Sequence, residues 1–339
     1  MTSSTTTRTV STARNRTPLH VFAGIGAVLA LIEVYLLVRW VTGPNFVSVP
    51  YGPSEPPTWM KIFVHLCETV FWVAAAVVIY KVVVQPWRRE RRIGFDGLMV
   101  ISAMLCSVYD PLQSYFHTWF GYNSYYVNRG TAMTEIPGWQ TAGEPHSALA
   151  WPILFIPPLY AVLFLGIAAL CNTLMRRAKS RWPGINFFGL AAIAFATVFV
   201  MDLLIEGQVL MRLGAYEETG WSFSWLDSTY SHDPIRNIVA FSFVFTFAAL
   251  LRYYRNDRGE TFVERGASRV GGSPAKVTGL RFLAVLTATM GCLVIGYHIP
   301  IAITTLISPN AAWHDGMVNS SFLNNHMCGA GTDRACPKG

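Results

Sequence analysis

Seven long apolar runs constrain the fold of this chain more than any other feature of its sequence. They cover residues 19–41, 59–84, 95–112, 150–175, 185–209, 238–254 and 280–307. A helix needs roughly 20 apolar residues to cross the hydrocarbon core of a bilayer, and most of the runs reach that length. They lack the alternation of a membrane β-barrel, and a lipid-exposed backbone must satisfy its own hydrogen bonds. The sequence therefore predicts an all-α polytopic membrane bundle of about seven transmembrane helices.

Composition supports this interpretation and sets the domain limits. Only 13% of the 339 residues are charged, whereas about 25% are charged in soluble domains. Residues 1–17 are rich in Ser and Thr, and no small-residue cleavage site is evident in the full-length apolar run that follows. We therefore expect a disordered cytoplasmic tail there rather than a targeting peptide. Residues 18–309 are expected to form the membrane domain, and 310–339 a polar extracytoplasmic tail.

Basic residues mark alternate connections between the apolar runs. Nineteen of the 26 lysines and arginines lie in residues 1–17, 81–92, 176–181 and 252–281. Because cytoplasmic loops carry an excess of Lys and Arg, these segments are predicted to face the cytoplasm. With seven spans, the N-terminus then lies inside and the C-terminus outside. This topology explains the net charge of +7, so we expect membrane lipids, and no nucleic acid, as partners.

Acidic residues inside the apolar runs need an explanation, because each costs roughly 2.5–3.5 kcal/mol at a bilayer centre. Asp202 and Glu206 are four residues apart, which places them on one face of an α-helix. His65 and Glu68 are three apart, which again places both on one face. The full set of acids within or at the ends of the runs is Glu33, Glu68, Asp110, Asp202 and Glu206.

Two interpretations of these acids remain open. In the structural one, they pair with nearby cations or hydrogen-bond across helices to hold the bundle; the available cations are Arg39, Lys61, Arg212 and Arg236. In the functional one, Asp110, Asp202 and Glu206 lie in the outer halves of their spans and face one outward-open cavity. Carboxyl groups that share an apolar cavity can retain a proton near neutral pH, as general-acid catalysis requires. Clustering at one depth favours the functional interpretation.

The stretch 110–130, DPLQSYFHTWFGYNSYYVNRG, contains seven aromatic residues interleaved with polar ones. Aromatic residues with polar tips are typical of a membrane interface and also of the wall of a cleft. We favour a cap over a cavity, because Asp110, which opens the stretch, is accompanied by other acids in the apolar runs. In that case the residues that bind polar groups of a substrate are Asn123, Tyr125, Asn128 and Arg129, and the cavity is lined by Trp119 and Trp139.

Several catalytic motifs are missing from the sequence. It contains no DDxxD-like cluster, no GxxxxGK[ST] phosphate loop and no GxSxG nucleophile elbow. His65 and Glu68 are too few for a convincing metal site. We therefore expect neither a cofactor nor a bound metal. Cys328 and Cys336 lie on the expected outer side, which permits a disulfide between them, whereas the remaining cysteines are expected to be apolar packing residues: Cys67, Cys106, Cys171 and Cys292.

Longer motifs carry a family resemblance. These are VPYGPSEPP at 49–57, DPLQSYF and YNSYYVNRG within 110–130, PGW at 137–139, and MDLLIEGQVLMRLGAYEETGW at 201–221. With them the chain resembles the AveC-like spirocyclase family of bacterial integral membrane proteins. The resemblance implies a protein of the bacterial cytoplasmic membrane that acts in polyketide or macrolide biosynthesis, forms a spiroketal and promotes a dehydration. It assigns no catalytic residue.

Residues and resemblance together predict a membrane-embedded cyclase. It would catalyse acid-promoted cyclisation, by spiroketal formation and/or dehydration, of a hydrophobic polyketide-like small molecule. The expected acid and base groups are Asp110, Asp202 and Glu206, with Glu68 and His65 in support. One alternative is a proton-initiated membrane terpene or meroterpenoid cyclase. Another is a non-enzymatic lipid-binding or transport protein, although the polar residues gather on one side only, which counts against transport. The sequence does not indicate an oligomeric state.

Overall fold

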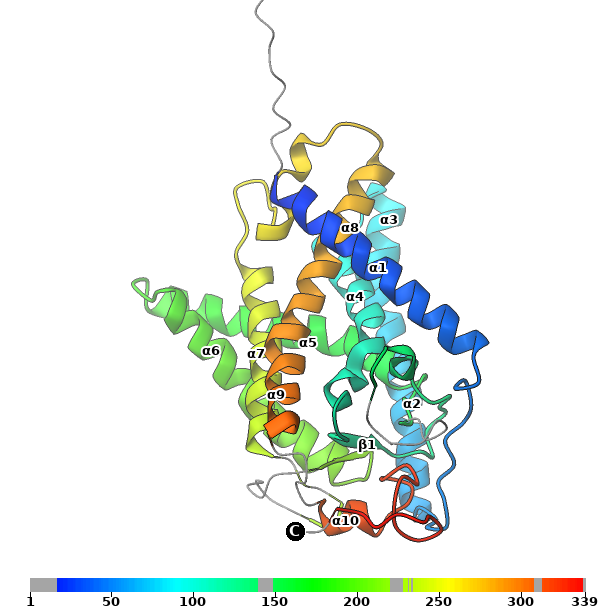
Figure 1. Ribbon diagram of the computed structural model, residues 1–339. Coiled ribbons are helices and arrows are strands. Elements are labelled where there is room, and N and C mark those ends of the chain that lie inside the picture. The colour runs from blue at the N-terminus through cyan, green and yellow to red at the C-terminus, as the bar shows by residue number, and fades with distance from the viewer. Residues whose placement is uncertain are drawn as a thin grey trace, which may run out of the picture.

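The computed structural model describes residues 17–139, 149–219, 228–230, 232, 234–307 and 313–337. Within these residues, seven helical spans are long and apolar enough to cross a membrane, which confirms the predicted seven-helix, all-α fold (Figure 1). The spans are Pro18–Thr42, Thr58–Glu90, Phe95–Ser114, Ile156–Arg181, Phe187–Met211, Ile235–Tyr253 and Pro274–Ile307. The fourth begins six residues later than predicted and continues through the basic residues at its end, because Lys and Arg are good helix formers.

Three of the seven spans consist of one α-helix, and the other four change their helical type along the way. The α-helices are α1 (Pro18–Thr42), α2 (Thr58–Ile79), α3 (Gln85–Glu90), α4 (Phe95–Cys106), α5 (Ile156–Arg181), α6 (Phe187–Asp202), α7 (Ile235–Tyr253), α8 (Pro274–Leu293), α9 (Ile299–Ile307) and α10 (Asp315–Val318). π-Helical segments at Tyr80–Val84, Leu203–Met211 and Val294–His298 extend α2, α6 and α8. A 3-10 segment, Ser107–Ser114, extends α4. Short 3-10 turns lie at Ala132–Glu135, Phe262–Glu264 and Ala267–Arg269.

Local sequence explains where several helices begin and end. α1 and α8 each carry proline in the first turn, where its missing N–H costs nothing. The side chain of Asn186 caps α6 by accepting from the backbone N–H of Gly189 at 3.0 Å. α3 ends at Arg91, which adopts the left-handed conformation with φ +53°. These signals place the helix ends at the polar connections.

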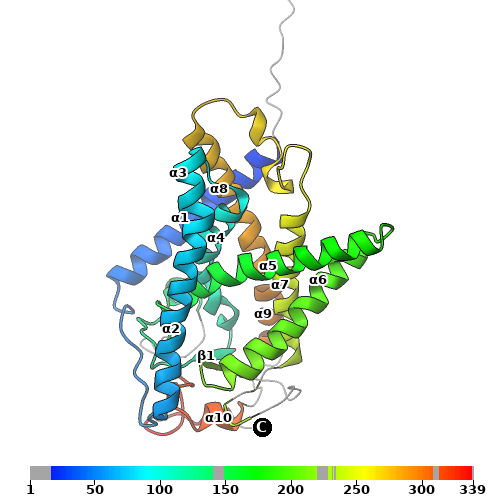
Figure 2. The same cartoon turned by 180° about the vertical axis from the view of Figure 1, so that it is seen from behind.

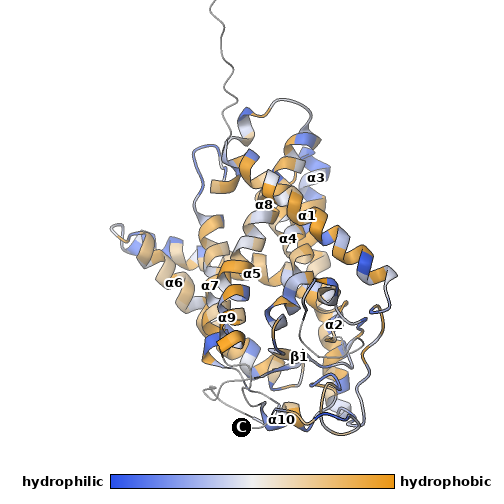
Figure 3. Cartoon of the chain, in the orientation of Figure 1, coloured by the Kyte–Doolittle hydropathy of each residue, from blue (hydrophilic) through white to orange (hydrophobic). Residues whose placement is uncertain are grey.

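α4 forms the centre of the bundle. Of its span, 72% is buried within the protein, compared with 22% for the spans of α1, α2 and α6. It packs against α5 and α8, while α1 packs along α8 and α6 along α7 (Figures 1 and 2). α1 and α8 approach so closely that a Cβ on Gly26 would lie 2.0 Å from the carbonyl oxygen of Leu283. The outer faces of α1, α2 and α6 are apolar and exposed, as expected for surfaces in contact with lipid (Figure 3).

The two ends of the molecule differ in content. The start of α1, α3 and the connection between α7 and α8 lie at one end (Figure 1). α10 and the C-terminal segment 313–337 lie at the other end, next to the small β-sheet (Figure 2). This arrangement is that of an integral membrane protein with an odd number of spans. The inside location of the N-terminus stays a prediction.

A two-stranded antiparallel sheet closes the second end. β1 (Phe120–Tyr122) pairs with β2 (Tyr216–Glu218), with Gly121 opposite Glu217. Only glycine fits at position 121, because a Cβ there would lie 1.9 Å from the carbonyl oxygen of Leu323 in the C-terminal segment. The aromatic stretch therefore lies inside the protein, beneath the C-terminal segment, and does not form a belt at the lipid headgroups.

Candidate functional site

A narrow cavity lies beneath the β1–β2 sheet, among residues of α5 and α7 and of the spans that contain α4, α6 and α8. Its volume is about 60 Å³, which is room for a few water molecules. Its polar lining is formed by Asp110, Gln113, Tyr122, Tyr160, Glu206, Tyr216, Glu218 and Tyr297. The rest of the lining is apolar: Phe120, Leu159, Leu163, Phe164, Leu210, Phe241, Val244, Phe245 and Leu293. Three carboxyl groups thus meet in a largely aromatic and aliphatic pocket.

Asp110 lies in the 3-10 extension of α4, where the tighter winding turns its side chain into the cavity. The residue is 6% exposed. Tyr122 of β1 donates its hydroxyl to Oδ2 at 2.6 Å, and Tyr160 of α5 donates to Oδ1 at 2.5 Å. Both carboxylate oxygens therefore have a phenol partner, and hydrogen bonds of this kind are among the stronger ones in proteins. The pair of phenols fixes the orientation of the carboxyl group.

Tyr122 and Tyr216 keep their protons under all ordinary conditions. Burial, and then the nearby Asp110 carboxylate, raise the pKa of Tyr122 well above its usual range. Burial, followed by the charge of Glu206, raises the pKa of Tyr216 in the same direction. Each phenol is therefore a permanent hydrogen-bond donor to the carboxylate beside it.

Glu206 lies on the π-helical segment that extends α6, half-buried at the cavity wall. Its side chain is hydrogen-bonded to Tyr216 of β2. The side-chain amide of Asn237, on α7, lies 3.5 Å from Oε1, at the limit of a hydrogen bond. Glu206 is thus held less tightly than Asp110 and retains capacity to accept a proton.

Glu218 is the third carboxyl group of the cavity, and the sequence did not single it out as a site residue. It is 1% exposed on β2, opposite Phe120. Glu218 interacts electrostatically with the guanidinium of Arg236, at the start of α7. Arg236 in turn lies 4.0 Å above the ring of Trp119, which holds the guanidinium beside the sheet.

Asp202 does not line the cavity, although it was expected on the same face as Glu206. It is the last residue of α6 and is 2% exposed. The helix becomes π-helical at Leu203, and a π-helix places about one more residue in each turn than an α-helix. Asp202 nevertheless lies about one helical turn further along the span from the sheet than Glu206, and the residues of this span that line the cavity are Glu206 and Leu210.

His65 and Glu68 form a pair on α2, outside the cavity lining. Nδ1 of His65 lies 2.8 Å from Oε2 of Glu68. Oε1 of Glu68 accepts the backbone N–H of Val127 at 2.8 Å. These contacts tie the aromatic stretch to α2, so the structure brings the pair into a supporting position rather than into contact with the cavity.

The predicted substrate-binding amides hold the backbone of their own loop. Asn123 donates to the carbonyl oxygen of Gly214 at 2.9 Å and accepts from the N–H of Tyr125 at 3.0 Å. Asn128 accepts from the N–H of Val49 at 2.8 Å and donates to backbone carbonyls within the stretch. Neither amide lines the cavity.

The other predicted substrate-binding residues also lie outside the cavity lining. Tyr125 packs near Lys61 of α2, whose ammonium is 5.3 Å from the ring centroid. Arg129 is exposed, and its backbone carbonyl accepts the indole N–H of Trp40. Trp119 is 1% exposed beneath Arg236. Trp139 contacts Tyr115 edge to face, with ring centroids 6.0 Å apart. Among the expected site residues, Asp110 and Glu206 are the two that line this cavity.

The cations proposed as structural partners of the acids have other contacts. Arg39 pairs with Glu135 at 3.4 Å, and Lys61 pairs with Glu55. Arg212 donates to the side chain of Gln208. Within the described residues, no group of three or more His, Cys, Asp and Glu side chains is placed to hold a metal ion. Cys328 and Cys336 form a disulfide, and the other cysteines are buried and free.

Comparison with known proteins finds a family model that matches the chain. Residues 90–317, more than half of the chain, match the family model described as spirocyclase AveC-like. The match contains every carboxyl group of the cavity. No curated protein and no solved structure matches the chain. Because this match covers more than half of the chain, the chain belongs to the AveC-like spirocyclase family.

Proposed function

We propose that this protein is a membrane-embedded cyclase that forms a spiroketal from a hydrophobic, polyketide-like keto-diol in the cavity beneath the β1–β2 sheet. One observation carries the proposal. A buried carboxyl group, Asp110, held by two phenols, faces an apolar cavity that also contains Glu206 and Glu218. Membership of the spirocyclase family supports the reaction class.

The reaction needs proton transfer and the removal of one water molecule. Protonation of the ketone oxygen lets the first hydroxyl attack the carbonyl carbon, and that hydroxyl then loses its proton to give a hemiketal. Protonation of the hemiketal hydroxyl lets it leave as water, which produces an oxocarbenium ion. The second hydroxyl attacks this ion and loses its proton to a base. The acid takes up the proton of the first hydroxyl and uses it for the second protonation, and the proton that the base removes from the second hydroxyl passes back to the acid before the next turnover. The products are the spiroketal and water, and no oxidant or reductant is needed.

The geometry suits this sequence of steps. Asp110 is the proposed acid, and its two phenols keep it in one orientation towards the cavity. Glu206 is the proposed base, because its looser contacts leave an oxygen able to accept the hydroxyl proton. Negative charge on Glu218 and the faces of Phe120 and Phe164 would stabilise the oxocarbenium ion. The same acid and base are suited to a dehydration, in which the base removes a proton from carbon.

The cavity also bears on the substrate class. Its lining is mainly aromatic and aliphatic, so burial of an apolar chain would supply most of the binding energy. Eight of the lining residues carry a polar group, and these would orient the oxygen atoms of the substrate. Because the cavity is narrow, we expect side chains at its wall to move apart when the substrate enters.

Untargeted metabolite and lipid profiling tests this proposal. A host would express the wild-type chain, Asp110→Asn, or the matched control Asp257→Asn, which changes an exposed acid in the connection between α7 and α8. With the wild type and with Asp257→Asn we expect a product whose mass is lower than that of its precursor by one water molecule. With Asp110→Asn we expect the precursor to remain. Equal profiles for all three, with protein present in the membrane, would contradict the proposal.

A further inference from the structure

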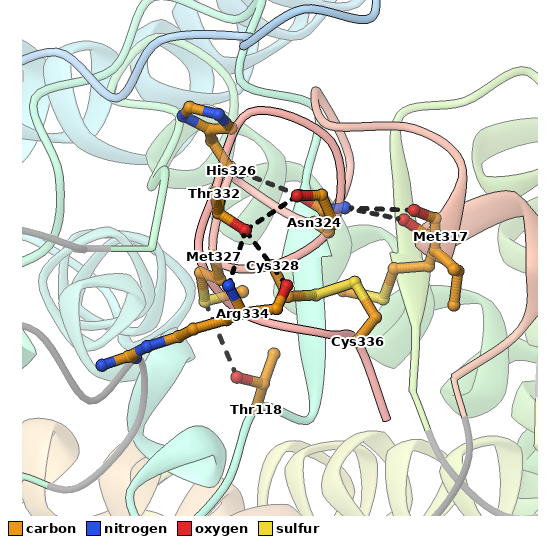
Figure 4. Close-up of a disulfide and its surroundings, with 11 residues drawn as sticks. Thr118, Met317, Asn324, His326, Met327, Cys328, Thr332, Arg334 and Cys336 are labelled. Atoms are coloured by element: carbon orange, nitrogen blue, oxygen red, sulfur yellow. Dashed lines mark hydrogen bonds between the residues drawn. A yellow bond between two sulfur atoms is a disulfide. The ribbon is translucent and has the colours of Figure 1, made fainter. Parts of the chain in front are cut away.

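The C-terminal segment 313–337 lies against the two elements that carry the phenols of Asp110. It contains the disulfide Cys328–Cys336, and its turns are held by hydrogen bonds of its own, including Thr332 to the carbonyl oxygen of Gly329 at 2.8 Å (Figure 4). Met317, Phe322 and Leu323 are at most 3% exposed. The segment is therefore packed as part of the fold. Residues 318–337 of the segment lie beyond those that match the family model.

Backbone contacts fasten this segment to β1. The carbonyl oxygen of Phe322 accepts the N–H of Ser124 at 2.8 Å. The carbonyl of Leu323 lies directly over Gly121. On its other side, Ser321 donates its hydroxyl to the carbonyl oxygen of Tyr51 at 2.6 Å, which links the segment to the Pro-rich connection after α1. The segment thus covers the outer surface of the sheet that closes the cavity.

Asn325 makes the contact that matters most for the site. Its Nδ2 donates to the backbone carbonyl oxygen of Tyr122 at 2.7 Å. Its Oδ1 accepts the backbone N–H of Ala150, in the segment leading into α5, at 2.8 Å. The residue is 3% exposed. One amide side chain therefore joins the strand that carries Tyr122 to the entrance of the helix that carries Tyr160, and these are the two phenols on Asp110.

The backbone at Asn325 also points to a specific role. Its φ is +54°, and that of His326 is +56°. Asn is one of the few side chains that adopt this left-handed conformation at low cost. The next residues run into the disulfide, which limits how far the turn can move. The turn therefore presents the amide to β1 and to the residues before α5 in a fixed orientation.

We propose that Asn325 is a positioning residue for the cyclase site. By holding the carbonyl of Tyr122 and the N–H of Ala150, it sets the distance between β1 and α5, so that both phenols reach the Asp110 carboxylate at once. This inference rests on the proposed function for its effect on turnover, whereas its effect on the Tyr122 phenol is independent of any reaction. A displacement of about 1 Å at a reacting group can cost on the order of a hundredfold in rate.

The kinetic test uses the full-length protein in lipid nanodiscs and a synthetic keto-diol. Asn325→Asp keeps an acceptor for Ala150 but places an oxygen against the carbonyl of Tyr122. Asn325→Gly keeps the left-handed backbone and removes both hydrogen bonds, which separates side-chain bonding from backbone strain. We expect each to lower kcat about ten- to a hundredfold and to leave KM nearly unchanged. The control Asn319→Asp, in the same segment, should match the wild type.

A spectroscopic test covers the case in which wild type shows no turnover. Fluorotyrosine incorporated at position 122 reports the environment of that phenol by fluorine NMR, and Asp110→Asn defines the signal of the phenol without its carboxylate. Asn325→Asp and Asn325→Gly should move the signal towards that reference, and Asn319→Asp should not. If wild type fails to cyclise the keto-diol but the signals move, the proposed function is wrong and the positioning role stands.

Two results would overturn the inference. One is a wild-type fluorine signal in both folded Asn325 variants. The other is an equal loss of kcat in the Asn325 variants, in the folded double variant Cys328→Ser with Cys336→Ser, and in the control Asn319→Asp. General loosening of the segment would then be enough to explain the loss of kcat. If neither Asn325 variant folds, Asn325→Gln decides, because it keeps the amide but displaces it by one methylene: it should lower kcat and shift the fluorine signal, and unchanged values would equally overturn the inference.

Discussion

The hydroxyl of Tyr160, on α5, lies 2.5 Å from Oδ1 of Asp110, in the 3-10 extension of α4. This bond joins two transmembrane spans at the wall of the cavity, and the Tyr122 hydroxyl completes it from β1 at 2.6 Å. A carboxyl group with a phenol on each oxygen is fixed in direction and protected from competing partners. The relationship between these residues leads to the first prediction.

Tyr160→Phe should lower kcat for ring closure about tenfold, because the Asp110 carboxyl group loses one of the two hydrogen bonds that orient it in the cavity. KM should change little, since the apolar ring that lines the cavity remains. Steady-state kinetics in nanodiscs would measure both values. Tyr115→Phe is the matched control, because the Tyr115 hydroxyl donates to the carbonyl oxygen of Pro137, away from the cavity. Equal effects of the two substitutions would argue against a special role for Tyr160.

Glu206→Gln should reduce turnover much more than Asp202→Asn. Glu206 lines the cavity, whereas Asp202 lies before the π-helical segment and outside the lining. Loss of a general base typically costs about a hundredfold or more. Single-turnover rates of the two variants, with thermal unfolding as a check on folding, would decide. A larger effect of Asp202→Asn in folded protein would place the chemistry elsewhere.

The sequence was sufficient to predict the bundle, because every lipid-facing backbone group must be satisfied within its own helix. It also predicted Asp110 and Glu206, since a carboxyl group in an apolar run is costly and needs a reason. It did not predict Tyr160, because a tyrosine in an apolar helix is equally compatible with packing. Glu218 was missed because it lies in a polar connection, where acids are common. The adjacent acids Glu217 and Glu218, which lie beside aromatic residues, are a signal that could have identified it.

Other differences have local physical causes. The pairing of Asp202 with Glu206 assumed that residues one turn apart reach the same cavity, but the cavity of this span begins at Glu206. Asn123 and Asn128 were expected to bind substrate, but a buried loop must first satisfy its own backbone groups, and these amides do so. The contact of Asn325 with β1 depends on a long-range approach that no local pattern records. Sequence patterns thus identified two of the carboxyl groups that line the cavity, but not the tertiary contacts that position them.

Glu68→Ala should lower stability without changing the chemistry. The substitution removes the acceptor of the Val127 N–H and the partner of His65, which should cost about 1–2 kcal/mol. Chemical unfolding in detergent would measure the loss, and kcat of the folded fraction should stay within about twofold of wild type. A large fall in kcat with unchanged stability would instead give Glu68 a role in the reaction.

The environment of Glu260 predicts that the connection between α7 and α8 becomes less stable at acid pH. Burial would raise its pKa, but the N–H groups of Ser268 and Gly266 and the amide of Asn256 outweigh burial and lower the pKa from 4.5 to about 2. A carboxyl group with a depressed pKa in the folded state stabilises the fold at pH values above its ordinary pKa. That contribution is lost as the pH falls from about 4.5 towards 2.

Thermal unfolding as a function of pH would test this. Wild type should exceed Glu260→Gln in Tm near neutral pH, and the difference should narrow as the pH falls below about 4.5. Glu90→Gln, which changes an exposed acid at the end of α3, should show no such pH dependence relative to wild type. A constant difference between wild type and Glu260→Gln across this range would show that the carboxylate charge is not what matters.

The central claim is that Asp110 supplies the proton for ring closure in the cavity. The most direct measurement is the single-turnover rate at which purified protein in nanodiscs converts a synthetic keto-diol to its spiroketal, for wild type and Asp110→Asn. Asparagine keeps the size of the side chain and lacks the acidic proton. The account predicts one spiroketal stereoisomer with wild type and a rate at least about a hundredfold lower with folded Asp110→Asn. Equal rates and the same stereoisomer from both proteins would contradict it.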